Sequence, residues 1–262
     1  MSNLISFFVS ISTLGFFVGI LINPKIIYFS ILVLLIIFFS LAKLYSWKLK
    51  SKNFWYFLIT PFLFFISSIL FFIFLEGHFF LKCIIISLFV VLQWFIYKNI
   101  FFLLKKPEKY QPNTIRNIFN FINLISIFFF ANGFYALIIF IGIPVWLLTS
   151  ILFLIVFLYL FQFFWINKIP EKKALFFALI LGLVFIEIFF IISFLPTSFY
   201  VNGLILTLIY FNIKNISKKY FLNSIKLKDD QPPTKIIKRE VIQYLIINIL
   251  ILALILGTAQ YH

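Results

Sequence analysis

Residues 118–165 read "IFNFINLISIFFFANGFYALIIFIGIPVWLLTSILFLIVFLYLFQFFW", and none of these side chains is charged. In an ordinary soluble domain about one residue in four is charged. A single helix over this stretch would be about 72 Å long, whereas about 30 Å is enough to cross the hydrocarbon core of a bilayer. The segment "GIP", Gly142 to Pro144, therefore predicts a turn between two membrane-spanning helices.

The rest of the chain has the same character, with 64% hydrophobic and 11% charged residues. In lipid the backbone must satisfy its own hydrogen bonds, so spans of this length are expected to be helices. We expect an all-α fold, a polytopic transmembrane helical bundle, with residues 1–262 forming a single integral membrane domain. About nine spans fit the apolar segments, over residues 4–22, 26–46, 54–75, 79–98, 118–141, 144–165, 174–195, 198–214 and 241–257.

The basic residues follow a pattern that predicts the topology. All but two of the 22 Lys and Arg residues fall after the second, fourth, sixth and eighth spans; the exceptions are Lys25 and Lys82. Loops rich in Lys and Arg stay in the cytoplasm. We therefore expect a multi-pass protein of the cytoplasmic membrane, with the N-terminus inside, four in-out-in hairpins, and a C-terminal helix that ends outside.

The loop over residues 212–240 is the longest polar segment and is strongly basic. On a soluble protein the net charge of +15 would suggest nucleic acid. Here the charge lies in short loops between apolar spans, so we expect the bilayer itself as the partner, and anionic inner-leaflet lipids in particular. Part of the loop is expected on the membrane surface, with a simple solvated connector as the alternative. No protein partner is indicated.

The sequence contains few of the residues that catalysis requires. Cys83 is the only cysteine, and Asp229 with Asp230 forms an isolated acidic pair in a loop. The motifs of zinc proteases, nucleotide-binding proteins and intramembrane prenyltransferases do not occur. We therefore predict no catalytic residue, no metal ligand and no cofactor. A membrane enzyme acting on lipid-linked substrates remains one alternative, with its site in the inner loop.

One acidic residue lies inside a predicted span, in the stretch "LGLVFIEIFFIISFL" from Leu181 to Leu195. Counted from residue 174, Glu187 is about 20 Å deep. A charge near the bilayer centre costs at least about 2.5 kcal/mol. Its neighbours three and four positions away are apolar, so we expect Glu187 to face inward toward other helices. The candidate partners in an intramembrane polar site are Asn132, Ser150, Thr207 and Lys82.

Two functions follow from this polar site. The first is a non-enzymatic protein with a structural or accessory role, in which Glu187 joins helices by hydrogen bonds. The second is a small permease in which Glu187 is a proton or cation site. Asparagine precedes glycine at Asn132 and Asn202. These two Asn-Gly pairs favour helix packing or helix-end chemistry over a helix broken at a binding site.

The topology can be tested with a reporter fused after His262. Because nine spans that start in the cytoplasm end outside, alkaline phosphatase fused there is expected to be active, and green fluorescent protein there to be dark. A cytoplasmic reporter signal at His262 would contradict the nine-span topology. A fusion after Lys173, in a predicted cytoplasmic loop, is the control that should give the opposite result.

Overall fold

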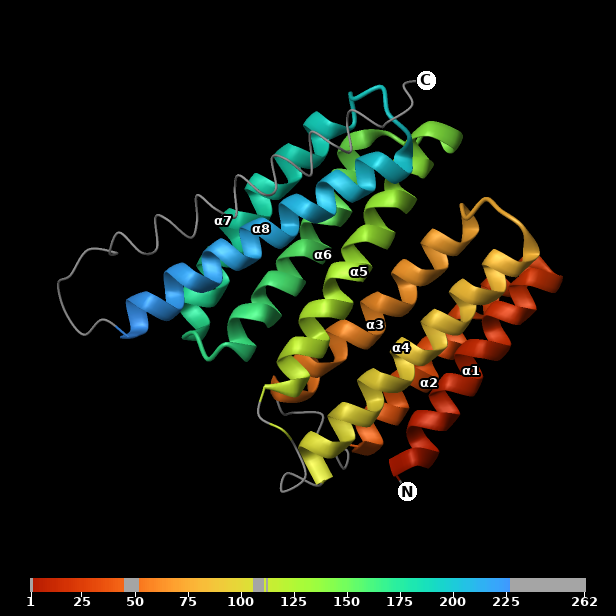
Figure 1. Cartoon of the computed structure of the whole chain (residues 1–262), viewed down its shortest axis with the longest axis horizontal. Helices are drawn as coiled ribbons and strands as arrows, with labels where there is room; N and C mark the ends of the chain where they lie inside the picture. Colours follow the sequence, from red (N-terminus) through yellow and green to blue (C-terminus); the bar gives the residue numbers. More distant parts are fainter. Residues whose placement is uncertain (1, 45–51, 106–110, 112, 227–262) are drawn as a thin grey trace. The chain divides into compact units, whose positions relative to one another are not determined.

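The computed structural model describes residues 2–44, 52–105, 111 and 113–226 (Figure 1). Within these ranges the regular elements are all helices, and none is a strand. Long runs of apolar residues without an internal Gly-Pro break explain this outcome, because a helix satisfies its own backbone hydrogen bonds.

The helices follow one another with short turns. They are α1 (Ser2–Ile22), η1 (Pro24–Phe29), α2 (Ser30–Leu44), α3 (Lys52–Ile73), α4 (Phe79–Lys105), α5 (Thr114–Ala136), η3 (Leu137–Ile141), α6 (Val145–Ile166), α7 (Glu171–Ile192) and α8 (Phe199–Lys226). Seven helical segments in the described residues are long and apolar enough to cross a membrane, namely α1, η1 with α2, α3, α4, α5 with η3, α6 and α7. The all-α, helical membrane character predicted from the sequence is confirmed. The count of nine spans and the hairpin arrangement stay predictions.

Helix limits differ from the predicted spans where lysines follow an apolar run. α8 starts at Phe199, as expected, but continues to Lys226, well past residue 214. The expected loop begins without Gly or Pro, and Lys is a good helix former, so a change from apolar to basic residues does not end the helix. The rest of the basic loop and the expected ninth span, residues 241–257, lie outside the described residues.

The expected turn at Gly142 to Pro144 is confirmed. The chain leaves α5 through the π-helical turn η3, and Gly142 takes up a left-handed conformation with φ of 73°. Glycine adopts that conformation without the steric cost that a Cβ atom brings. Pro144 then precedes the first residue of α6, Val145. Proline suits a helix start because the N–H that it lacks has no helical partner there.

The described residues form two compact units that divide between Ser126 and Ile127, within α5. The first unit has an aromatic core in which the ring of Phe17 lies 5.0 Å from that of Phe89 and 5.4 Å from that of Phe72. Hydrogen bonds also join its helices: the Tyr97 hydroxyl donates to the Ile37 carbonyl over 2.7 Å.

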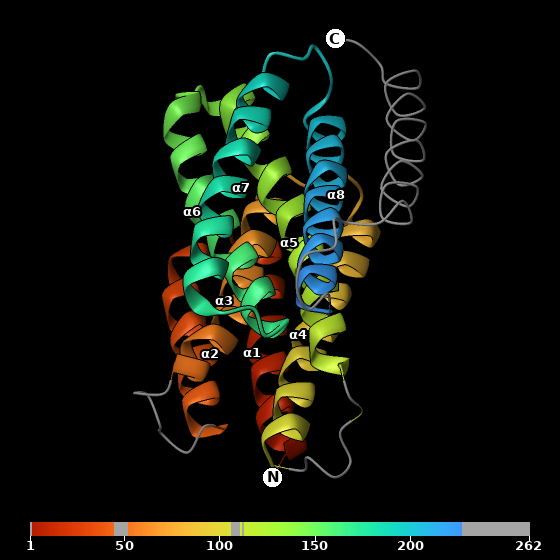
Figure 2. The same ribbon diagram turned by 90° about the vertical axis from the view of Figure 1, so that its left-hand side faces the viewer.

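The first unit has antiparallel neighbouring helices. α1 starts, α2 ends, α3 starts and α4 ends at one end of this unit (Figures 1 and 2). The described basic side chains at this end include Lys43, Lys98 and Lys105. The first unit is therefore basic at the end where the sequence predicts cytoplasm.

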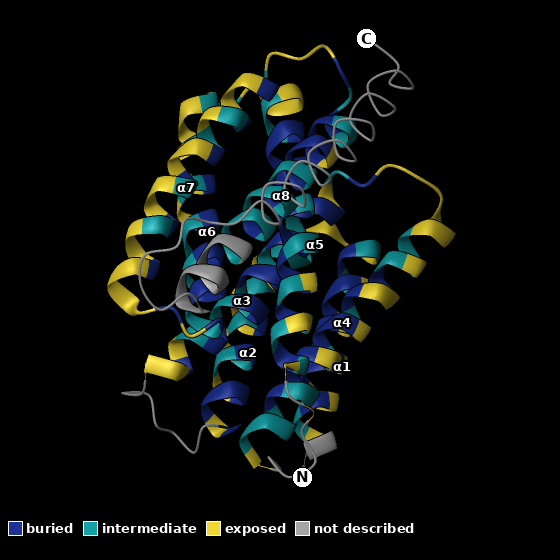
Figure 3. Cartoon of the chain, turned by 60° about the vertical axis from the view of Figure 1, so that its left-hand side comes forward, coloured by how far each residue is buried: buried dark blue, intermediate teal, exposed yellow. Residues whose placement is uncertain are grey.

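The second unit contains the rest of α5 with α6, α7 and α8. The Tyr135 ring stacks on Phe189 with centroids 4.7 Å apart, and its hydroxyl donates to the Phe189 carbonyl over 3.1 Å. α5 and α8 approach closely, because a Cβ atom on Gly203 would lie 2.5 Å from Nδ2 of Asn132. Figure 3 shows buried residues on one side of α7 and exposed residues on the other.

The close approach of α5 and α8 gives a stability prediction. Gly203→Ala is expected to lower the free energy of unfolding by about 1–3 kcal/mol, since the new methyl group overlaps the buried Asn132 side chain. The measurement is denaturant-induced unfolding of the purified protein in detergent, followed by circular dichroism.

Gly15→Ala is the matched control, because a Cβ atom at Gly15 meets nothing within 4 Å. Alanine within a helix is favoured over glycine by about 0.5–1 kcal/mol, so this variant should be at least as stable as the wild type. If Gly203→Ala were as stable as Gly15→Ala, the close contact between α5 and α8 would be contradicted.

Candidate functional site

Glu187 lies on the exposed side of α7. Phe185 and Phe189 are fully buried, and Glu187 is exposed between them in sequence. Two residues along a helix correspond to a rotation of about 200°, so Glu187 points away from the side that packs on Tyr135. The predicted inward orientation of Glu187 is therefore wrong within the described part of the chain.

An open groove surrounds the Glu187 side chain. It has a volume of about 500 Å³ and is lined by Trp146 and Thr149 of α6 and by Ile186, Glu187, Phe190 and Ile191 of α7. We call this the α6–α7 groove. Apart from Thr149 and Glu187, its side chains are apolar or aromatic. It therefore presents one carboxylate within an apolar wall.

The groove lies near one end of the two helices. Trp146 is the second residue of α6, and α7 ends at Ile192, only five residues after Glu187. That separation corresponds to about 7.5 Å along the helix. The sequence had extended this span to residue 195, which placed Glu187 deeper. The structure instead places it beside the first turns of α6, toward the end of the unit predicted to face outside.

This position reduces the electrostatic cost of the carboxylate. Four N–H groups at a helix start lack helical partners, and the helix dipole adds positive potential there. Among the described residues, no hydrogen bond or ion pair involves Glu187. The other two described carboxylates, Glu76 and Glu171, take part in interactions. Glu187 is thus the carboxylate available to a partner in the described part of the chain.

The other predicted site residues do not gather around Glu187. Asn132 is buried and donates from Nδ2 to the Phe128 carbonyl over 2.6 Å. Thr207 is buried on α8 and donates to the Gly203 carbonyl over 2.7 Å. Each of these side chains therefore bonds within its own helix.

Two candidate partners remain, Ser150 and Lys82. Ser150 is exposed and donates to the Trp146 carbonyl over 2.9 Å. Lys82 is half-buried on α4 and belongs to the first unit. The described contacts of these two residues therefore supply no partner for the carboxylate.

The two Asn-Gly pairs serve packing and a helix start, as expected. The Asn132 side chain lies against Gly203, so the second glycine permits the close contact of α5 with α8. Asn202 accepts a hydrogen bond from the Thr197 hydroxyl, which fixes the turn before α8. These contacts occupy the polar residues that a binding site would have required.

Sequence reasoning missed a buried lysine, Lys214 on α8. It is only 4% exposed, and its Nζ atom lies 5.8 to 5.9 Å from the ring centroids of Phe163, Tyr210 and Phe211. A cation near aromatic faces is stabilised by the ring quadrupoles. The signal was in the sequence, because aromatic residues three and four positions earlier share its helix face.

Comparisons and metal chemistry add no further assignment. No group of three or more His, Cys, Asp or Glu in the described residues could hold a metal ion. Asp229 and Asp230, the acidic pair of the expected inner loop, lie outside those residues. No protein-family model, curated protein or solved structure matches this chain.

Proposed function

We propose that this integral membrane protein has a structural or accessory role and binds a transmembrane helix of a partner protein in the α6–α7 groove. The partner helix carries a Lys or Arg near its outer end, which pairs with the Glu187 carboxylate. The observation that carries the proposal is the exposed Glu187 side chain within an apolar groove.

Desolvation supports a partner at this position. An ionised side chain in contact with hydrocarbon is costly, and such residues normally face protein or water. Glu187 is exposed, and Phe190 and Ile191 beside it are 44% and 64% exposed. A helix laid in the groove would bury these apolar side chains and give the carboxylate a cation or a hydrogen-bond donor.

Charge complementarity favours a basic partner. The chain as a whole carries +15, so nonspecific attraction would bring acidic molecules rather than basic ones. A basic helix that binds here must therefore do so through the local carboxylate. Glu187 is the only titratable side chain that lines the α6–α7 groove.

The interior polar residues favour this role over a permease. An ion pathway needs polar groups that face a common passage. Asn132 and Thr207 instead bond to backbone carbonyls of their own helices, and Asn132 also packs on Gly203. These contacts support a packing role for the polar side chains.

A designed helix provides a direct test of the groove. The probe is a single-span helix of leucines with one lysine about five residues from its outer end, reconstituted with the purified protein and followed by energy transfer. We expect the wild type to bind it and Glu187→Leu to bind about five- to thirty-fold more weakly, since an intramembrane polar contact contributes about 1–2 kcal/mol.

Two controls isolate the effect of Glu187. Glu171→Gln removes a carboxylate at the other end of the same helix and should leave binding unchanged, and an all-leucine probe should bind the wild type weakly. Equal binding of the lysine probe by Glu187→Leu and the wild type would overturn the proposal. Disulfide bonds between copies carrying Ile191→Cys would show that a second copy fills the groove instead.

Proton transport gives an independent prediction. In proteoliposomes with a pH-sensitive dye inside, we expect the wild type and Glu187→Gln to dissipate a proton gradient at the same rate. The reason is that Glu187 lies on an outward groove near a helix end rather than on an interior path. A flux in the wild type that Glu187→Gln abolishes would establish the permease function in place of the accessory one.

A further inference from the structure

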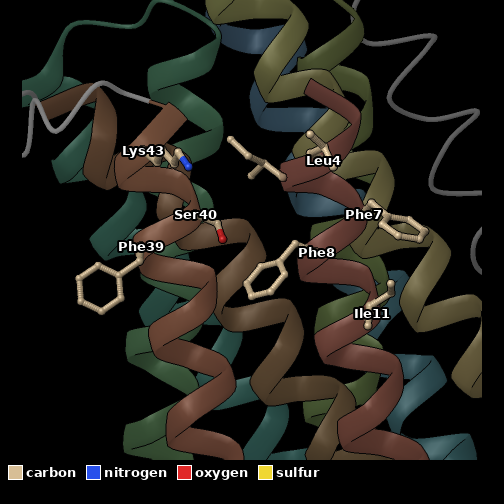
Figure 4. A pocket seen from close by; sticks show the side chains of 8 residues that line it. Leu4, Phe7, Phe8, Ile11, Phe39, Ser40 and Lys43 are labelled. Atoms are coloured by element: carbon tan, nitrogen blue, oxygen red, sulfur yellow. The ribbon is translucent and has the colours of Figure 1, made fainter. Parts of the chain in front are cut away.

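A second groove lies in the first unit, between the start of α1 and the end of α2 (Figure 4). Its volume is about 630 Å³, which is within the range of small-ligand sites. It is lined by Leu4, Ile5, Phe7, Phe8, Ile11, Phe39, Ser40 and Lys43. We call this the α1–α2 groove.

The packing of the first hairpin explains why the groove opens at this end. At the turn, α1 and η1 are in close contact, because a Cβ atom on Gly19 would lie 3.0 Å from Cδ1 of Ile26. At the other end α1 carries Phe7 and Phe8, which are 59% and 58% exposed. The helices are thus held together near Gly19 and leave a groove toward Leu4.

The polar groups of the groove are confined to α2. Ser40 and Lys43 lie three residues apart and so share one face of the helix. In Figure 4 both side chains point toward the space between α2 and α1, while Phe8 extends into that space from α1. The α1–α2 groove therefore has long apolar walls with a hydroxyl and an ammonium group on one side.

The surrounding charge is positive. The same end of the first unit carries Lys98 and Lys105 at the end of α4, and no Asp or Glu is found among its described residues (Figure 2). Lys43 forms no ion pair within the described part of the chain. An anionic group placed at the mouth of the groove would meet several cations and no opposing charge.

We propose that the α1–α2 groove binds one anionic glycerophospholipid from the bilayer. An acyl chain lies along Phe8 and Ile11, and the head-group phosphate accepts hydrogen bonds from the Lys43 ammonium and the Ser40 hydroxyl. Anionic lipids are abundant on the side of the membrane where this end is predicted to lie. This site is independent of the partner helix proposed for the α6–α7 groove.

The chemistry of the groove selects this occupant over an apolar one. An apolar helix packed here would bury Ser40 and Lys43 without partners, which is unfavourable. A zwitterionic lipid would fill the apolar walls equally well but would bring a cation toward Lys43. A phosphate with net negative charge satisfies both groups, while its acyl chain covers the exposed phenylalanines.

Native mass spectrometry of the purified full chain tests the site. The protein is exchanged into detergent with equal amounts of phosphatidylglycerol and phosphatidylcholine of identical acyl chains, and the bound lipids are counted. We expect the wild type to retain one phosphatidylglycerol preferentially. Lys43→Gln should reduce that preference about five-fold, which corresponds to about 1 kcal/mol for one lysine near a membrane surface.

Lys98→Gln is the matched control. Lys98 lies at the same end of the unit but does not line the groove, and its Nζ atom stands 4.3 Å from the Trp94 ring centroid. It should change the lipid preference by less than two-fold. Circular dichroism checks that each variant is folded, and Ser40→Ala tests the hydroxyl without a change of charge, with a smaller expected loss.

Three results would overturn the proposal. The first is a wild type that retains both lipids equally. The second is an equal loss of preference in Lys43→Gln and Lys98→Gln, which would show a general effect of surface charge. The third is efficient disulfide formation between copies carrying Phe8→Cys in native membranes, which would show that a second copy occupies the groove.

Discussion

The structure depends on one constraint, that backbone N–H and C=O groups in hydrocarbon must be satisfied within the chain. Helices meet it along each span, and the turns require special residues. Asn23 accepts a hydrogen bond from the Lys25 N–H where Pro24 begins η1, and Gly142 takes a left-handed conformation before Pro144. Turns in this chain therefore form where a side chain cap, a glycine or a proline removes the cost of leaving a helix.

The same constraint limits what polar side chains in the spans can do. Ser10, Ser67 and Thr149 donate to backbone carbonyls three or four residues earlier in their own helices. Hydroxyl groups satisfied in this way are less available to a neighbouring helix or a ligand. Contacts between helices depend instead on rings and small residues, such as Tyr135 on Phe189 and Asn132 on Gly203.

These two effects explain which features the sequence could predict. The helical membrane character and the turn before Pro144 follow from properties of short segments, such as apolar length and residue conformation. The orientation of Glu187 does not, because α7 is apolar on nearly every side and its composition does not indicate which side packs on Phe185 and Phe189. The length of α8 was missed for a related reason, since lysines end a membrane span without ending a helix.

The two grooves are the places where apolar side chains stay exposed next to a charge. The α6–α7 groove has a carboxylate at the start of α6, and the α1–α2 groove has an ammonium group at the end of α2. In the predicted topology these helix ends lie on opposite sides of the membrane. A carboxylate on the outer side is far from the anionic inner leaflet and suits a basic protein residue. An ammonium group on the inner side lies among anionic head groups and suits a lipid. The sign of one charge in each groove thus decides which kind of occupant it selects.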